Sequence, residues 1–295
     1  MRAMPGWWAV VLWGLLAVLP GPARGEENHA PPGAATYTLR YVFRPGQTMR
    51  WDVTHRLSVR TSISDTTQIA ETSSTSVKVW RVQQVAADGT ATFEHRVEDV
   101  DMRQKLTGRE EVRYNSRTDK HPPPGFQDVA RSLGVTLAVV TLDNKGKLIK
   151  RQRLVGKGDA NAETQIAIPL PEEAIPVGYT WSRPSQQDVT TPNGLYKKVL
   201  TLQRFTLESV KTGVATISVE TQILTPIHDP ALEAQLIQFG SRGAVRFDVD
   251  AGQVLGTQMD LDKQVVGFRG AASSIHYLTR FTERLRSQST EVAAK

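Results

Sequence analysis

The stretch MRWDVTHRLSVRTSI, residues 49–63, decides the fold because two kinds of side chain alternate over an unusual length. One set of alternate positions is mostly apolar: Met49, Trp51, Val53, His55, Leu57, Val59, Thr61 and Ile63. The positions between them are polar or charged. A period of two is typical of a strand with one buried face, and at about 3.3 Å per residue this strand would be roughly 50 Å long. Since a strand that long twists strongly, the pattern predicts a curved sheet, a half-barrel or a long ribbon around an apolar interior.

Most of the remaining chain also alternates, apart from two short helical patterns. The strand that begins near Ala91 changes phase at residues 98–99, which predicts a β-bulge, and we expect it to continue to Tyr114. Apolar residues at helical spacing predict amphipathic helices near 126–133 and 229–239. The predicted fold class is mainly β, with long, curved antiparallel strands in two tandem related units. Each unit is expected to contain one short amphipathic helix.

Several residues of the first half recur in the same order in the second half. The corresponding pairs are Trp51/Trp181, Gly89/Gly213, Gly134/Gly240 and Gly146/Gly252. This agreement predicts an internal duplication, with a first β-rich repeat at 36–168 and a second at 169–295. The alternative is that unrelated β-meanders use the same turn residues.

The N-terminus resembles a secretory signal peptide. Arg2 precedes an apolar run from Trp7 to Leu19, and a small-residue exit follows, so we expect signal peptide 1–25 to be removed. The alternative, a membrane anchor, is disfavoured because the run is shorter than the roughly 20 residues that span a bilayer. Residues 26–35 are expected to form a flexible lead-in. The chain has no Cys, so a large core must stabilise the exported protein without disulfides.

Charge and motifs argue against several functional classes. The formal charge is +6, or +4 without the two arginines of the signal peptide, and basic residues alternate with acids. Nucleic acid is therefore not an expected partner. The nucleophile elbow, the zinc-protease motif, the P-loop and the dinucleotide fingerprint are absent. An EF-hand starting at Asp248 would have Gln253 and Met259 where Gly and Glu are required. We expect no catalytic residue, no metal and no cofactor.

Four residues are candidate ligand-binding residues. His55 and His95 lie on the apolar faces of long strands, and if those strands pair, the two imidazoles share an interior and can contact a ligand. Trp51 and Trp181 occupy equivalent strand starts and can stack on a sugar or a lipid. For each residue the alternative is a structural role, as a hydrogen-bonded histidine or a tryptophan anchor of the core.

Four segments carry a resemblance that covers nearly the whole mature chain: PGQTMRWDVTHRLSVRT, VKVWRVQQVAADGTATFEH, GREEVRYNSRTD and GVATISVETQIL. Together with the signal peptide, these segments resemble a family of exported proteins of unknown function from planctomycete-type bacteria. That resemblance implies no catalytic residue. At the level of the fold, long curved strands beside a short helix are also similar to the half-barrels of periplasmic lipoprotein carriers.

These observations lead to three functional hypotheses. The first is an exported, non-enzymatic envelope protein, periplasmic or secreted, that binds a lipid, another apolar ligand or an envelope protein on a curved sheet. It would have no stable membrane span after signal cleavage. The second is a structural or protein-interaction module without a ligand. The third is a hydrolase whose paired carboxylates have no local motif.

Overall fold

The structure, a computed structural model, describes residues 24–25, 35–155, 167–190 and 196–286. Its strands in the first half are β1 (Arg24–Gly25), β2 (Thr36–Tyr37), β3 (Thr48–Ile63), β4 (Thr66–Val85), β5 (Ala91–Leu106), β6 (Val112–Asn115), β7 (Thr136–Leu142) and β8 (Leu148–Arg153). Those in the second half are β9 (Ile175–Pro176), β10 (Thr180–Thr190), β11 (Tyr196–Lys211), β12 (Val214–Ile223), β13 (Arg242–Asp248), β14 (Gln253–Val266) and β15 (Ser273–Leu285). The helices are α1 (Gln127–Ser132), α2 (Pro230–Leu236) and the 3₁₀ turn η1 (Ile237–Phe239).

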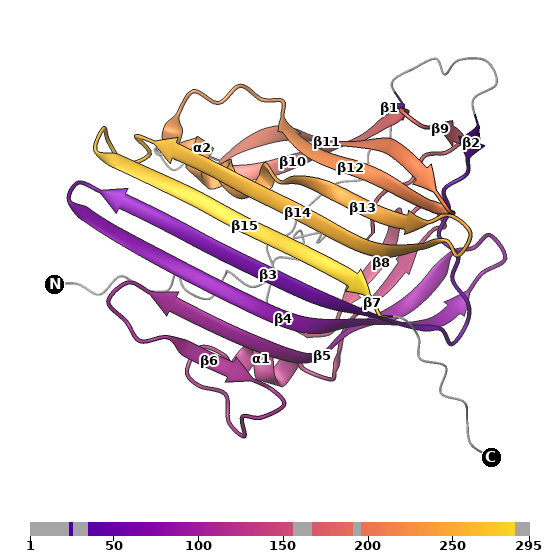
Figure 1. Cartoon of the computed structure of the whole chain (residues 1–295), viewed down its shortest axis with the longest axis horizontal. Helices are drawn as coiled ribbons and strands as arrows, with labels where there is room; N and C mark the ends of the chain where they lie inside the picture. Colours follow the sequence, from indigo (N-terminus) through magenta and orange to yellow (C-terminus); the bar gives the residue numbers. More distant parts are fainter. Residues whose placement is uncertain (1–23, 26–34, 156–166, 191–195, 287–295) are drawn as a thin grey trace.

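One large antiparallel sheet dominates the protein, which confirms the predicted mainly β class. The strand order is β1-β10-β11-β12-β13-β14-β15-β3-β4-β5-β7-β8, with β6 paired to β5. Figure 1 shows the long strands β14, β15, β3 and β4 side by side, with the rest of the sheet curving behind them. The sheet does not close, since β8 ends one side of the order and β1 the other. Strands β2 and β9 form a separate small pair.

Residues 49–63 form a single strand, as predicted, and that strand lies in the middle of the sheet. On β3 the side chain of Trp51 is buried while its neighbours Arg50 and Asp52 are exposed. We call the side of the sheet that carries Trp51 the inner face and the opposite side the outer face. The C-terminal strand β15 pairs with β3 along its whole length. The first and last long strands of the chain therefore join the two halves of the sheet.

Strand β5 confirms one local prediction and contradicts another. Val97 pairs with Lys78 and Val100 with Ser76, so residues 98–99 lie opposite the single residue Val77 and form a bulge, as predicted. The expected continuation to Tyr114 is wrong, because β5 ends at Leu106. The chain turns there, and β6 folds back to pair antiparallel with β5. Alternation continues across this turn, so the sequence pattern alone did not reveal it.

The two predicted helices are present, and each packs on its own part of the inner face (Figure 1). Phe126 precedes α1 and is buried against Met102 and Tyr114 of β5 and β6. Helix α2 begins after Asp229, whose Oδ1 accepts a hydrogen bond from the Ala231 amide at 2.8 Å, a standard N-cap. Leu236 of α2 is buried in a cluster with residues of β10 and β11.

A larger core at one end of the sheet joins the two halves around residues 37–43. Tyr41 lies between the halves, with its ring at 5.4 Å from Phe247 and 5.8 Å from Phe43. The Tyr41 amide donates to Asn144 O at 2.7 Å, and the Val42 amide donates to Gly252 O at 2.9 Å. This segment therefore bridges the β7–β8 turn of the first half and the β13–β14 turn of the second half.

The order of elements is similar in the two halves. In the first, β3, β4 and β5 precede α1, and β7 and β8 follow it; in the second, β10, β11 and β12 precede α2, and β13 and β14 follow it. Gly146 and Gly252, which the sequence comparison paired, occupy the two turns that contact residues 37–43. The division into related units at 36–168 and 169–295 stays a prediction. The signal peptide and the lead-in fall almost wholly outside the described residues, and cleavage after Gly25 would remove β1.

Replacing Gly252 by Ala tests the role of the contact with residues 37–43. Gly252 has φ of +61°, and a Cβ there would lie 2.5 Å from Val42 N. An alanine would be strained in this left-handed backbone conformation, and its Cβ would overpack against Val42. Together these effects should lower the free energy of unfolding by about 3 kcal/mol. Gly46 is a matched control, because its φ is +76° but no atom lies within 4 Å of the position that a Cβ would take. Gly46→Ala should cost only about 1 kcal/mol. Urea denaturation measures both, and equal costs would contradict the steric explanation.

Candidate functional site

Both candidate tryptophans are buried in the core. Trp51 is 2% exposed, its Nε1 donates to Val254 O at 3.2 Å, and its ring meets Trp80 edge-on at 5.0 Å. Trp181 is 1% exposed, donates to Pro169 O at 2.8 Å and stacks on Phe205 at 5.5 Å. With their indole N–H groups bonded to backbone carbonyls, both have the environment of core anchors, the alternative raised from the sequence. A ligand-binding role for them stays a prediction.

His95 is buried beside two cations on the inner face. Burial, which has the largest effect, and the charges of Lys78 and Arg151 together lower the pKa of its imidazole to about 3. Lys78 forms an ion pair with Glu283 and lies over the Trp51 ring, 4.6 Å from its centroid. A positive charge on His95 would therefore be both desolvated and repelled, so the residue is neutral at physiological pH.

His55 lies elsewhere on the inner face and is only partly buried. Its Nε2 is 2.9 Å from Thr279 Oγ1, its ring centroid is 6.4 Å from that of Phe281, and burial lowers the pKa of the imidazole. The strands of His55 and His95 do not pair, because β4 lies between them. His55 is opposite Ser74 on β4, whereas His95 is opposite Trp80, six residues further along. The structure thus does not bring the two imidazoles together.

His55 belongs instead to an apolar area formed by β3 and β15. We define the inner-face patch as His55, Val59, Ile275, Tyr277 and Phe281. Cross-strand pairing places Phe281 opposite His55 and Tyr277 opposite Val59, so these side chains share one face. All five are partly exposed, and none belongs to the three hydrophobic clusters of the described residues. The sequence showed the alternation of both strands but not that the two are neighbours.

The borders of the inner-face patch differ in character. On the β4 side the neighbouring residues are small, with Ala70 opposite Val59 and Ser74 opposite His55. On the β14 side Lys263 lies opposite Tyr277 and is 2.9 Å from Glu233 of α2. Helix α1 packs mainly on β5 and β6, and α2 mainly on β10 and β14, so both helices are centred on strands other than β3 and β15. Burial raises the pKa of Tyr277, as expected for a phenol on a partly desolvated surface.

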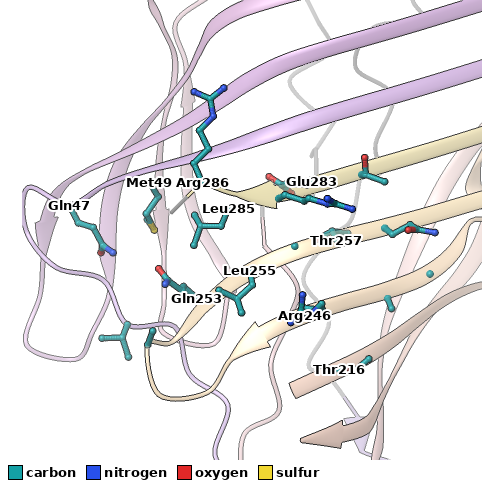
Figure 2. A pocket seen from close by; sticks show the side chains of 18 of the residues that line it. Gln47, Met49, Thr216, Arg246, Gln253, Leu255, Thr257, Glu283, Leu285 and Arg286 are labelled. Atoms are coloured by element: carbon teal, nitrogen blue, oxygen red, sulfur yellow. The ribbon is translucent and has the colours of Figure 1, made fainter. Parts of the chain in front are cut away.

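The outer face contains a second candidate site, an open cavity of about 1160 Å³. Figure 2 shows Gln47 and Met49 on one side of it and Arg246, Thr257 and Glu283 along the neighbouring strands. Four arginines line it: Arg44, Arg246, Arg284 and Arg286. Sequence reasoning missed this site because its residues come from β12 to β15, from the start of β3 and from the loop before it. Only the pairing of these strands brings its arginines together.

A second outer-face cavity, of about 1460 Å³, has balanced charges. A row of charged residues crosses five neighbouring strands, and each residue pairs with the next one in the row. In order from β12 to β3 these residues are Glu220, Arg242, Asp260, Arg280 and Arg56. Arg280 Nε lies 2.6 Å from Asp260 Oδ1. Because acids and bases neutralise each other here, the surface has no preference for a ligand of one charge. Within the described ranges, no three His, Asp or Glu side chains are grouped as metal ligands, and no helix is long and apolar enough to cross a membrane.

No protein-family profile matches the chain, and no curated protein matches it. A lipovitellin structure concerned with lipid–protein interactions aligns at 12% identity with a TM-score of 0.37, over 86% of this chain and 26% of that chain. This chain therefore spans about a quarter of lipovitellin. The β domain of the Bordetella autotransporter BrkA aligns at 11% identity with a TM-score of 0.32, over 80% of this chain and 98% of that one. Similarities this low imply neither a common function nor a common ligand.

The burial of His95 predicts a specific dependence of stability on pH. Because its pKa is about 3 in the folded state and near 6.5 when unfolded, acid protonates the unfolded chain first. The contribution of His95 is therefore complete above pH 6.5 and is lost as the pH falls towards 3. Between pH 7 and pH 5 this loss amounts to about 2 kcal/mol.

His95→Gln should reduce the acid loss of stability by that amount, measured by urea denaturation at pH 7 and pH 5. The exposed loop residue His121 provides the control, and His121→Gln should leave the pH dependence as in the wild type. If His95→Gln retained the full acid loss, a neutral buried imidazole at this position would be ruled out.

Proposed function

We propose that the protein is an exported, non-enzymatic component of the cell envelope that binds an elongated apolar ligand, such as a lipid acyl chain, on the inner-face patch. One observation carries this proposal. Four apolar side chains of β3 and β15, together with His55, face inward yet belong to no hydrophobic cluster of the described residues. Apolar side chains that are left partly exposed outside the buried clusters form an available binding surface.

The dimensions of the inner-face patch suit an extended chain. Ile275 and Phe281 are six positions apart on β15, which corresponds to about 20 Å of strand. Each methylene group of a ligand buried there would contribute about 0.8 kcal/mol. The small side chains of β4 beside the patch, among them Ala70 and Ser74, leave room for a ligand lying along the strands.

The chemistry of the borders favours an amphipathic ligand over a purely hydrocarbon one. The Thr279 hydroxyl donates to Arg56 O at 2.9 Å and also contacts His55. Lys263 and Glu233 form an ion pair beside Tyr277. A polar head group placed near these residues would keep its hydrogen bonds while its apolar part covers the patch. Export is supported by the signal-like apolar run of residues 7–19, which lies outside the described residues.

The hydrolase alternative has less support. Catalysis of that type needs two carboxylates near each other, one of them with a raised pKa. Among the described residues the buried carboxylate is Glu283, and it pairs with Lys78. A carboxylate held by a cation is suited to a structural role.

A negative charge on the inner-face patch should abolish ligand retention. Tyr277→Glu places a carboxylate among the patch residues, where contact with an apolar ligand would require its desolvation. The matched control is Leu278→Glu, the next residue on the same strand, which faces outward and is 46% exposed. We expect the wild-type protein and Leu278→Glu to enhance the fluorescence of N-phenyl-1-naphthylamine, with displacement by oleate. Binding by Tyr277→Glu should be weaker by about tenfold or more.

Native mass spectrometry of the full chain, purified from a bacterial envelope, extends this test to the natural ligand. The wild type and Leu278→Glu should retain a lipid that Tyr277→Glu lacks, and circular dichroism should show that all three are folded. Equal probe binding and equal lipid content in the three proteins would refute the proposed site.

A further inference from the structure

We infer that the arginine-lined cavity on the outer face binds a phosphate group, which Arg246 and Arg284 hold from two sides above Gly256. This site is separate from the inner-face patch, because the sheet lies between them. The inference therefore does not depend on the proposed apolar ligand.

The register of three strands places the two arginines together. Arg246 of β13 is opposite Gly256 of β14, and Gly256 is opposite Arg284 of β15. Paired residues of adjacent antiparallel strands share a face, so both arginines extend from the same side. Neighbouring strands are about 4.8 Å apart, which separates the two Cα atoms by roughly 10 Å. Two arginine side chains span that distance from opposite sides and can contact one small anion.

Gly256 leaves the space between the two arginines open. A Cβ at this position would lie 2.9 Å from Glu283 O, so the strands pack here in a way that excludes any side chain. The nearby cavity residues are also small and uncharged. Thr216 pairs with Arg246, Ala244 lies two residues before Arg246, and Thr282 lies two residues before Arg284. The floor is therefore bare backbone bordered by hydroxyl groups. Guanidinium groups prefer planar or tetrahedral oxyanions, which they bind through two hydrogen bonds at once.

The positive charge of the cavity is not neutralised from within. Arg44, Arg246 and Arg284 have no carboxylate within ion-pair distance in the described part of the chain. Asp52 is the cross-strand neighbour of Arg284, but its Oδ1 accepts a hydrogen bond from Arg286 at 2.6 Å. Arg286 is therefore the cavity arginine that is already paired, and the other three remain available to an anion.

The acid that lines the cavity does not offset this charge. Glu283 borders the cavity through its strand, but its side chain is on the inner face, where it pairs with Lys78. An excess of positive charge around an open floor distinguishes this cavity from the charge-balanced cavity beside it.

A double substitution, Arg246→Gln with Arg284→Gln, tests the inference. Both residues are exposed, so the change should not affect folding, which thermal denaturation will verify. The control is Arg60→Gln with Arg81→Gln, which removes the same charge from exposed strand positions outside the cavity. Two probes distinguish the source of the phosphate. Glycerol 3-phosphate, titrated by calorimetry, represents a soluble phosphate, and phosphatidylglycerol vesicles, compared with phosphatidylcholine vesicles in a flotation assay, represent a lipid head group.

We expect the wild-type protein to bind one of these probes, with at least about tenfold weaker binding for the cavity double variant and unchanged binding for the control. Saturable binding of glycerol 3-phosphate would identify a soluble ligand. Binding only to phosphatidylglycerol vesicles would identify a membrane head group. The inference is overturned if the wild type binds neither probe, if the cavity variant binds as well as the wild type, or if the control loses as much affinity as the cavity variant.

Discussion

The structure depends on the burial of residues 37–43 between the two halves of the sheet. The backbone of this segment donates one hydrogen bond to each half, from Tyr41 to Asn144 and from Val42 to Gly252. Its inward side chains, Leu39, Tyr41 and Phe43, are part of the largest hydrophobic cluster. An open sheet with so many strands has no barrel closure to fix its curvature. The buried segment supplies that constraint at one end by holding the two turns at a set separation.

This constraint also explains the uneven filling of the interior. At the end where the segment lies, aromatic residues such as Phe93 and Phe205 are fully buried. Towards the other end, α1 and α2 each cover only a local cluster on separate strands. The strands between the helices, β3 and β15, consequently keep partly exposed apolar side chains on their inner face. The inner-face patch is thus a result of long strands combined with short helices.

The two faces of the sheet have different chemistry because a strand sends alternate side chains to opposite sides. On β15 the inward positions include Tyr277 and Phe281, whereas the outward positions include Arg280 and Arg284. One strand therefore contributes both to an apolar surface and to a basic cavity. A molecule with an acyl chain and a phosphate cannot reach both sites at once through the intact sheet, so the two proposals describe two ligands or two parts of a larger assembly.

The sequence by itself determined the fold class, the long strand of residues 49–63, the bulge at residues 98–99 and both helices, because each is encoded by a local period or a turn signal. It also singled out Gly146 and Gly252, whose relation by duplication stays a prediction, and the structure places both in the turns that contact residues 37–43. Only the tertiary structure decided that β15 pairs with β3, that β4 separates His55 from His95, and that Arg246 and Arg284 flank Gly256. The pairing of β15 with β3 joins residues more than two hundred positions apart in the chain. Its register is selected by the packing of the whole inner face, and a local sequence pattern holds no information about that packing.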